Sequence, residues 1–202
     1  HLAEVMAGLN GIRFHLADVM PRATKQTGTP AFKRWFDNSK VVDAQGKPLV
    51  VYHGAAEDFT AFDAGKIGLR DPGFFGAGFY FSPDEEVAQS YADSAAEDSD
   101  LDIGDSAVIP AYVSLQNPFI WDSSPAGAPA TRSALAEFGI KRDSVRGDSN
   151  ALGNSKEREA FNRKVRDAGY DGVVVRDEDG IQEVVAFRPE QIKSAVGNRG
   201  TF

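Results

Sequence analysis

The sequence predicts an α+β protein whose sheets are mostly antiparallel. Its apolar, strand-like runs are short and only loosely interleaved with helical segments, whereas a doubly wound parallel sheet needs regular alternation of strands and helices. Residues 172–176 and 182–187 are two such runs on either side of the turn 177–180, which is the pattern of a hairpin. The glycine-rich run 73–78 leads into a strand, so it is neither a dinucleotide-binding fingerprint nor a P-loop.

Length and composition fit one large domain with a small appendage. The 202 residues are 42% hydrophobic, which is enough to bury a core. Cysteine is absent and the three histidines are scattered, so disulfides are excluded and no metal site is expected. The apolar runs are too short for a transmembrane helix, and no membrane partner is expected. The net charge of −8 argues against a protein that grips nucleic acid mainly through surface charge.

Residues 1–28 are interpreted as an N-terminal helical extension that ends in a linker. Apolar side chains recur at helical spacing over residues 2–20, and Pro21 ends the pattern. No signal peptide is visible, and because His1 is not a natural start we expect a processed or excised fragment. The main domain is expected over residues 29–202.

Caps, prolines and glycines mark the ends of the elements expected in the main domain. A capping box from Ser82 to Glu85 opens one helix. Residues 93–106 carry acidic but no basic residues, and they are expected to form an exposed loop. The expected helices are one from Pro30 capped by Thr29, one over 83–92, one over 132–138, and one capped by Asn154 or Ser155 that ends at Gly169. The expected strands, besides the hairpin, cover 48–53, 79–82 and 108–115.

The first candidate for a functional residue is His53, which follows the apolar run 49–52 and precedes Gly54. An imidazole at the end of a strand could hydrogen-bond a sugar hydroxyl. Gly54 would let a flat ligand approach its backbone N–H and C=O closely. The alternative is a half-buried histidine whose hydrogen bonds are satisfied within a turn.

Two tyrosines form the second candidate pair. In a strand, Tyr80 points opposite to Phe79 and Phe81, and Tyr91 follows eleven residues later in the next expected helix. Two phenol rings brought together in this way could sandwich an aromatic cation such as nicotinamide, each contact contributing on the order of 1 kcal/mol. The alternative is that both are core aromatics.

Charged residues complete the candidate set. Alternation puts Glu183 on the face of Val185 and Phe187, where a carboxylate is costly unless it has a partner or a function. The alternative is that Glu183 ends the hairpin turn. Arg70 and Lys66 lie in the glycine-rich loop 64–78 that precedes the strand of Tyr80, and they could meet a pyrophosphate, although such charges are more often solvated.

These residues resemble the His-Tyr-Glu branch of the ADP-ribosyltransferase superfamily, which contains diphtheria toxin and the poly-ADP-ribose polymerases. Residues 29–54 and 187–195 are more similar still to transferase domains in polyvalent proteins of phages and mobile elements. The resemblance covers about residues 29–202. The matching segments are Tyr52-His53-Gly54, Gly78-Phe79-Tyr80-Phe81-Ser82, Ala88 to Tyr91 and Glu183 to Phe187.

The resemblance implies a split β-sandwich of two mostly antiparallel sheets, with an NAD cleft between them. It implies that His53 binds ribose hydroxyls and that Gly54 holds the carboxamide. Tyr80 and Tyr91 would stack on the nicotinamide, and Glu183 would stabilise a cationic transition state. Catalysis would therefore depend on Glu183, His53 and Tyr80. Further NAD contacts are expected from Gly78, Ser82 and Arg70.

The implied activity is transfer of ADP-ribose from NAD to a protein or nucleic-acid acceptor, with release of nicotinamide, in an effector or toxin domain. NAD glycohydrolase activity and a catalytically silent binding module are the alternatives. NAD would be a substrate, no metal would be required, and an immunity or regulatory partner is compatible with this activity. The site of action would be the cytoplasm, including that of a target cell.

Two positions depart from the family pattern. Ala55 stands where a hydroxyl residue is usual, so we expect one ribose or nicotinamide contact of the family to be missing. Gln182 directly precedes Glu183, so the E/Q-x-E signature of arginine-specific transferases is absent. Arginine is therefore not supported as the acceptor.

Overall fold

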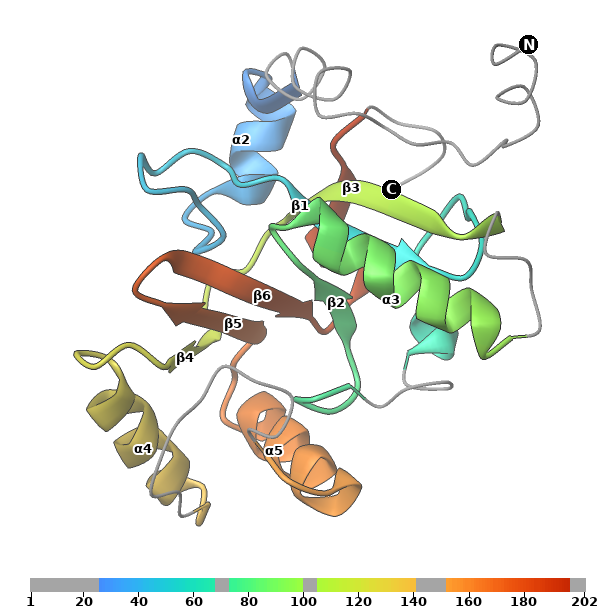
Figure 1. Ribbon diagram of the computed structural model, residues 1–202. Helices are drawn as coiled ribbons and strands as arrows, with labels where there is room; N and C mark the ends of the chain where they lie inside the picture. The colour runs from blue at the N-terminus through green and yellow to red at the C-terminus, as the bar shows by residue number, and fades with distance from the viewer. Residues whose placement is uncertain (1–25, 68–72, 100–104, 141–151, 197–202) are drawn as a thin grey trace, which may run out of the picture.

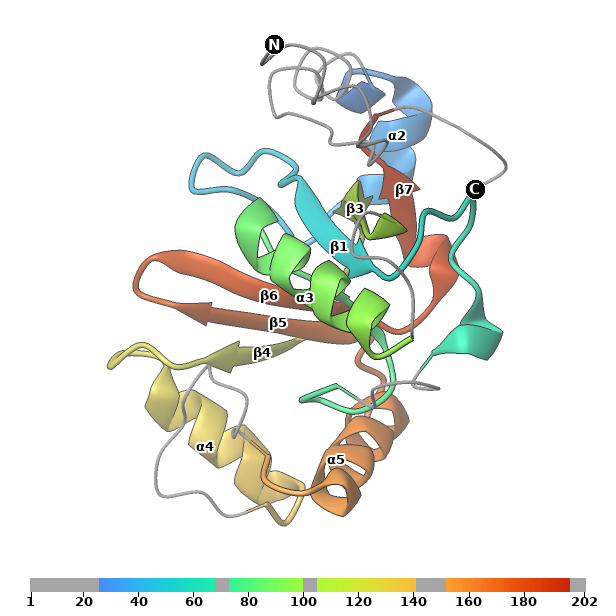
Figure 2. The ribbon, with the colours of Figure 1, turned by 45° about the vertical axis from the view of Figure 1, so that its right-hand side comes forward.

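The computed structural model describes residues 26–67, 73–99, 105–140 and 152–196, and in this part the strands form two sheets (Figures 1 and 2). The order of the three-stranded sheet is β1 (Val51–Ala55), β3 (Ala107–Val113), β7 (Ile192–Ser194). The order of the four-stranded sheet is β2 (Phe79–Phe81), β6 (Gly180–Ala186), β5 (Gly172–Asp177), β4 (Phe119–Asp122). These strands pair antiparallel except β4 with β5, so the predicted α+β class with mostly antiparallel sheets is confirmed.

The two sheets share a hydrophobic core. Val51 and Val113 of the three-stranded sheet pack in one cluster with Phe81, Val174 and Val184 of the four-stranded sheet. All five side chains are almost inaccessible to solvent. Burial of such side chains stabilises the fold by roughly 2 kcal/mol each. The shared core shows that the two sheets pack face to face, as expected for a sandwich.

The sheets are also joined through the main chain where β1 meets the end of β2. Tyr52 N donates to Ser82 O (2.7 Å), and Ser82 N donates to Tyr52 O (2.9 Å). Since β3 occupies one edge of β1, this bridge uses the other edge. The main-chain groups of Tyr52 therefore point away from β3.

Two helices, α4 (Ala128–Glu137) and α5 (Ser155–Asp167), cover the outer face of the four-stranded sheet (Figure 1). Leu135 and Phe161 of these helices pack with Val173 and Val185 of the strands. As predicted, Asn154 caps α5, its side chain accepting from Glu157 N (3.2 Å). The helix stops before Gly169, which has a φ of +84°.

The helix α2 (Pro30–Phe36) lies over the three-stranded sheet. Thr29 Oγ1 accepts from Phe32 N (3.2 Å), as its predicted capping role requires. Phe32 and Phe36 are buried, and Phe32 packs edge-on against Tyr112 of β3. The expected N-terminal helix over residues 2–20 lies outside the described residues.

The helix α3 spans Glu85–Glu97, so the expected span of 83–92 was wrong at both ends. The cap is Asp84, whose carboxylate accepts from Glu86 N (2.8 Å). Ser82 Oγ instead accepts from Asp84 N (3.0 Å) in the turn before the helix. The helix continues past residue 92 because a stripe of alanines, a strongly helix-forming residue, packs against β1. The members of this stripe are Ala88, Ala92 and Ala96.

The expected acidic loop over 93–106 was therefore wrong for its first five residues, 93–97, which are helical. Asp93 has specific partners, accepting from Ser106 Oγ and Gln89 Nε2 (2.7 Å each). Residues 100–104 lie outside the described part of the chain. Asp93 is therefore a helical residue held by two hydrogen-bond donors, not part of an exposed loop.

Four other differences concern three strands and one helix, and one of them is β7 (Ile192–Ser194), a strand that was not predicted. β1 covers 51–55 rather than 48–53, because Pro48 makes only an isolated bridge to Val42. β4 was not predicted, because a strand of only four residues that directly follows Pro118 has too short a pattern to be distinguished from a loop. α4 spans Ala128–Glu137, so it begins four residues before the expected helix over 132–138. The hairpin of β5 and β6 was predicted correctly.

Candidate functional site

His53 lies in the middle of β1, not at its end as predicted. Its Nδ1 is 2.8 Å from the carbonyl oxygen of Tyr80. A carbonyl only accepts, so Nδ1 carries the hydrogen in this contact. Burial lowers the pKa of the imidazole, so the ring is neutral at pH 7. The lone pair of a neutral ring with this tautomer is on Nε2, which can accept a hydrogen bond from a hydroxyl.

Aromatic rings enclose this imidazole. Phe59, Phe62 and Phe81 have centroids 5.9, 5.2 and 5.5 Å from the His53 ring. Because they exclude water from one side of His53, they account for the lowered pKa. The alternative of a histidine satisfied within a turn does not hold, since His53 bonds across from one sheet to the other.

Tyr80 points to the opposite side of β2 from its two phenylalanine neighbours, as predicted. Phe79 and Phe81 belong to the core between the sheets, whereas Tyr80 packs on the cluster of the outer face. Its Oη donates to Gly76 O (2.6 Å) and accepts from Phe75 N (2.9 Å). The phenol therefore has a fixed position beside the loop that precedes β2.

Glu183 lies on the same face of the four-stranded sheet as Tyr80. Glu183 pairs with Val175 of β5. Two positions further along β6, on the same face, Val185 pairs with Val173 of β5 on one side and with Tyr80 of β2 on the other. Residues that pair directly share a face, and Glu183 lies two positions, or about 7 Å along the strand, from the partner of Tyr80. The chain thus brings the phenol and the carboxylate to adjacent strands.

The alternative that Glu183 merely ends the hairpin turn was wrong, because β6 begins at Gly180. A bulge at this point leaves Gln182 between two pairs, Val175 with Glu183 and Arg176 with Ile181. Burial raises the pKa of the Glu183 carboxyl to about 7. A raised carboxyl pKa is typical of catalytic groups, although burial alone also produces it.

Tyr91 is exposed on α3, with 53% of its surface accessible. It lies three residues after Ala88, whose carbonyl oxygen would overlap a Cβ placed on Gly54. Glycine at position 54 is thus required for α3 to approach β1. The side of Gly54 that a side chain would occupy is filled by α3, so its main-chain N–H and C=O are the groups that it can offer to a ligand, and their predicted contact with a flat ligand stays a prediction.

Gly78 and Ser82 also have structural roles. A Cβ on Gly78 would overlap Cγ1 of Val185, and Ser82 is buried in the turn before α3. Arg70 lies outside the described residues. Lys66 is exposed at the end of a short 3-10 helix, Ala64–Lys66.

One residue at the site was not found from the sequence. Asn162 of α5 is buried and bonds two carbonyl oxygens of the loop before β2. The available signal was an asparagine among the apolar positions Phe161 and Val165 of a helix.

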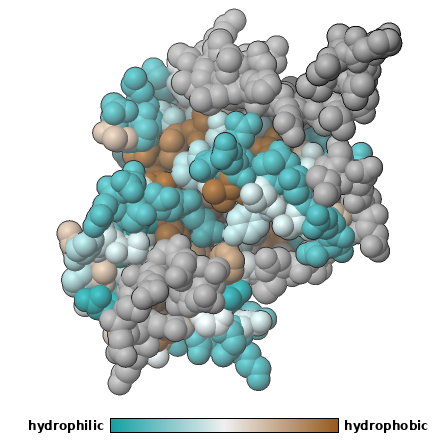
Figure 3. Space-filling view, viewed as in Figure 1, coloured by the Kyte–Doolittle hydropathy of each residue, from teal (hydrophilic) through white to brown (hydrophobic). Residues whose placement is uncertain are grey.

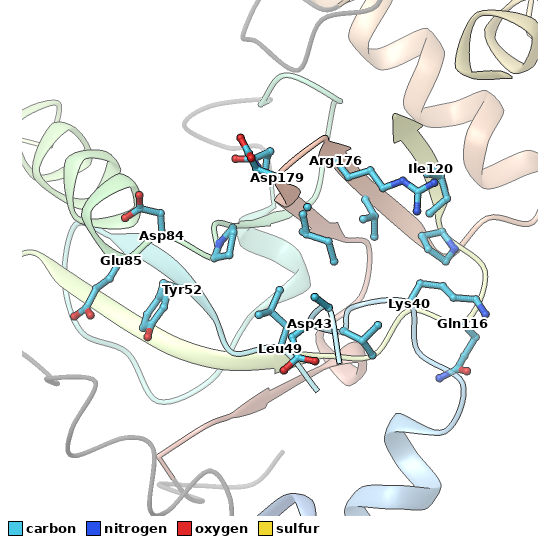
Figure 4. A pocket seen from close by; sticks show the side chains of 18 of the residues that line it. Lys40, Asp43, Leu49, Tyr52, Asp84, Glu85, Gln116, Ile120, Arg176 and Asp179 are labelled. Carbon is cyan, nitrogen blue, oxygen red and sulfur yellow. The ribbon is translucent and has the colours of Figure 1, made fainter. Parts of the chain in front are cut away.

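An open groove of about 1150 Å³ lies apart from these residues. Tyr52 lines it, but His53, which points to the opposite face of β1, does not. Figure 4 shows Asp84 and Glu85 at one end and Lys40 and Arg176 at the other. In the space-filling view, hydrophobic residues are visible in the hollow beside the β5–β6 hairpin, surrounded by hydrophilic ones (Figure 3). This mixed lining favours no particular class of ligand.

Within the described ranges, no cluster of three or more histidine, aspartate or glutamate side chains could hold a metal ion. Among the described helices, none is both long and apolar enough to cross a membrane.

Comparison with known proteins gives one family match. The model of the family described as "ADP-Ribosyltransferase in polyvalent proteins" matches residues 43–202. A chain from the M. tuberculosis MbcT–MbcA toxin–antitoxin complex is 16% identical, with 73% of this chain and 81% of that chain covered and a TM-score of 0.44. An anti-CRISPR protein is 15% identical, with 71% and 93% covered and a TM-score of 0.33. No curated protein matches the chain.

Proposed function

The chain belongs to the family of ADP-ribosyltransferases found in polyvalent proteins, and on that premise we propose that it transfers ADP-ribose from NAD to a macromolecule and releases nicotinamide. The observation that carries the proposal is Glu183, a partly buried carboxylate on the same face as Tyr80. The main-chain carbonyl oxygen of Tyr80 in turn accepts a hydrogen bond from His53. These are the three residues that the resemblance assigns to catalysis.

The reaction breaks the bond between the nicotinamide nitrogen and C1′ of the ribose. The electron pair of that bond leaves with nicotinamide, and positive charge develops on the ribose as an oxocarbenium ion. A nucleophile of the acceptor then bonds to C1′ and loses its proton. An ionised Glu183 near C1′ would gain interaction energy as the charge develops, so it would lower the barrier instead of merely binding substrate.

The electrostatics of the free site fit this role. Burial raises the pKa of Glu183 to about 7, so near neutral pH the carboxylate is about half ionised before NAD binds. The nicotinamide ring of NAD is cationic, and an adjacent positive charge favours the ionised carboxylate. Substrate binding would therefore complete the ionisation that the chemistry needs.

His53 would position the sugar. With its hydrogen on Nδ1 and bonded to Tyr80 O, its Nε2 would accept a hydrogen bond from a ribose hydroxyl. A protonated imidazole could not accept, so the lowered pKa of His53 supports this role.

The carboxamide of nicotinamide would bind the main chain of Gly54. Groups two residues apart in a strand point to the same edge, so the N–H and C=O of Gly54 are directed like those of Tyr52, away from β3. One donor and one acceptor match the C=O and NH₂ of a carboxamide. Tyr80 and Tyr91 would stack on the two faces of the ring.

We propose a macromolecular acceptor and an effector or toxin role, within a catalytic domain over residues 29–202. The net charge of −8 favours a protein acceptor over a nucleic acid. The position of Gln182, adjacent to Glu183, leaves arginine unsupported as the modified residue.

The test uses NAD labelled in the adenosine moiety, incubated with the protein and a cell lysate. The expected result is nicotinamide release together with label on a macromolecule, and neither with Glu183→Gln. Release of free labelled ADP-ribose alone would show that water is the acceptor. Absence of any nicotinamide release, with or without lysate, would contradict the proposed activity.

A further inference from the structure

The loop over residues 73–78 lies between β2 and α5 and is held from both sides. We propose that Asn162 of α5 is a positioning residue, which fixes this loop and through it the Tyr80 ring on which nicotinamide would stack. The inference rests on the proposed function. No feature of the sequence alone assigns Asn162 a role.

The side-chain amide of Asn162 uses both of its donor hydrogens, and its oxygen accepts one hydrogen bond. Nδ2 donates one hydrogen to Phe75 O (2.9 Å) and the other to Ala77 O (3.1 Å). Oδ1 accepts from Arg166 Nε (2.8 Å). A buried amide with two donors and one acceptor is therefore satisfied only while the loop keeps this conformation.

The same loop holds the phenol from the other side. Phe75 N donates to Tyr80 Oη (2.9 Å), which donates in turn to Gly76 O (2.6 Å). Phe75 thus bonds Asn162 through its carbonyl and Tyr80 through its amide. A shift of this one residue would change both contacts.

Close packing adds to the hydrogen bonds. Gly76 has a φ of +80°, and a Cβ there would lie 2.6 Å from the Cβ of Asn162. Arg166 also donates to Ala77 O (2.9 Å), and its guanidinium lies 4.0 Å from the centre of the Phe187 ring. Arg166 therefore fixes the orientation of the Asn162 amide.

The kinetic signature of this role differs from that of a stability defect. A stacking surface contacts the nicotinamide ring before and during bond cleavage, so its displacement weakens both states equally and raises KM with little change in kcat. A variant that is merely less folded would lower kcat in proportion to the active fraction and leave KM unchanged.

The experiment measures KM and kcat for NAD in the full chain carrying Asn162→Leu, Tyr80→Phe, or both. We expect Asn162→Leu to raise KM about tenfold and to leave kcat nearly unchanged. A tenfold change is of the size that the loss of one buried hydrogen-bond partner produces. The double variant should show less than the product of the single effects, because both act through one loop. Arg163→Gln, on the exposed side of α5, is the matched control and should leave KM unchanged.

A KM within twofold of wild type for Asn162→Leu, or fully multiplicative effects in the double variant, would overturn the inference. If Asn162→Leu does not fold, Asn162→Asp keeps the shape, removes the donors and takes its place. Hydrogen exchange of the Phe75 amide gives a readout without NAD, and it should be faster in either variant than in Arg163→Gln. Wild-type protein that does not turn over NAD would refute the proposed function, whereas unchanged exchange would refute the positioning role alone.

Discussion

Raising the pH from 6 to 8 should increase kcat/KM for nicotinamide release by about tenfold. The reason is Glu183, whose pKa burial raises to about 7. A group with that pKa is about 10% ionised at pH 6, about half at pH 7 and about 90% at pH 8. If only the ionised form stabilises the transition state, the rate follows these fractions.

His53 does not contribute to this rise. Burial holds the pKa of its imidazole below the ordinary 6.5, so the ring is already neutral over most of the interval. A plot of log kcat/KM against pH should therefore have a slope near +1 below pH 7 and a plateau above it. The bound nicotinamide cation favours the carboxylate, so the midpoint for kcat should lie at a lower pH than that for kcat/KM.

The assay is initial-rate release of nicotinamide at NAD concentrations well below KM, in buffers of constant ionic strength. Glu183→Asp keeps a carboxylate but draws it back by one methylene, and it is the matched variant for charge without reach. A flat profile between pH 6 and 8 in wild type, or wild-type rates in Glu183→Gln, would refute the assignment of Glu183 as the transition-state carboxylate.

Three further predictions concern stability and binding. The pKa of Glu183 is about 7 in the fold and 4.5 ordinarily, so its ionisation destabilises the fold as the pH rises from about 4.5 to about 7. Glu183→Gln should therefore raise the free energy of unfolding by up to about 3 kcal/mol at pH 8 and by little at pH 4. Thermal unfolding at the two pH values checks this. Gly54→Ala should destabilise the protein by about 2 kcal/mol or more, since its Cβ would overlap a carbonyl oxygen of α3; Gly65→Ala, which lacks main-chain contact, should cost much less, and equal costs in urea unfolding would contradict the packing argument. Tyr91→Ala should weaken NAD binding about fivefold with little change in stability, because the side chain is 53% exposed; Val87→Ala, one turn earlier and 42% exposed, is the calorimetric control, and an unchanged Kd for Tyr91→Ala would exclude its stacking role.

Local signals were enough to predict much of the fold. The alternation around Tyr80 was interpreted correctly because strand geometry alone separates it from its neighbours. The hairpin and the caps at Thr29 and Asn154 were also predicted correctly, since each depends on a few adjacent residues.

Features that depend on distant parts of the chain were missed. The length of α3 follows from an alanine stripe packed on β1, and the structural role of Gly54 follows from the same contact. β4 is short and gains its stability from pairing with β5, more than fifty residues away. Asn162 bonds a loop far from it in sequence, so its place between Phe161 and Val165 could show that it is buried but not which groups it bonds.

The contact between His53 and position 80 ends on a carbonyl oxygen, an atom that every residue type supplies. Exchange of the ring at position 80 therefore leaves the imidazole tautomer intact. In the proposed reaction, a substitution at position 80 would change the surface that stacks on nicotinamide and would leave the hydrogen bond that orients His53 toward the ribose unchanged.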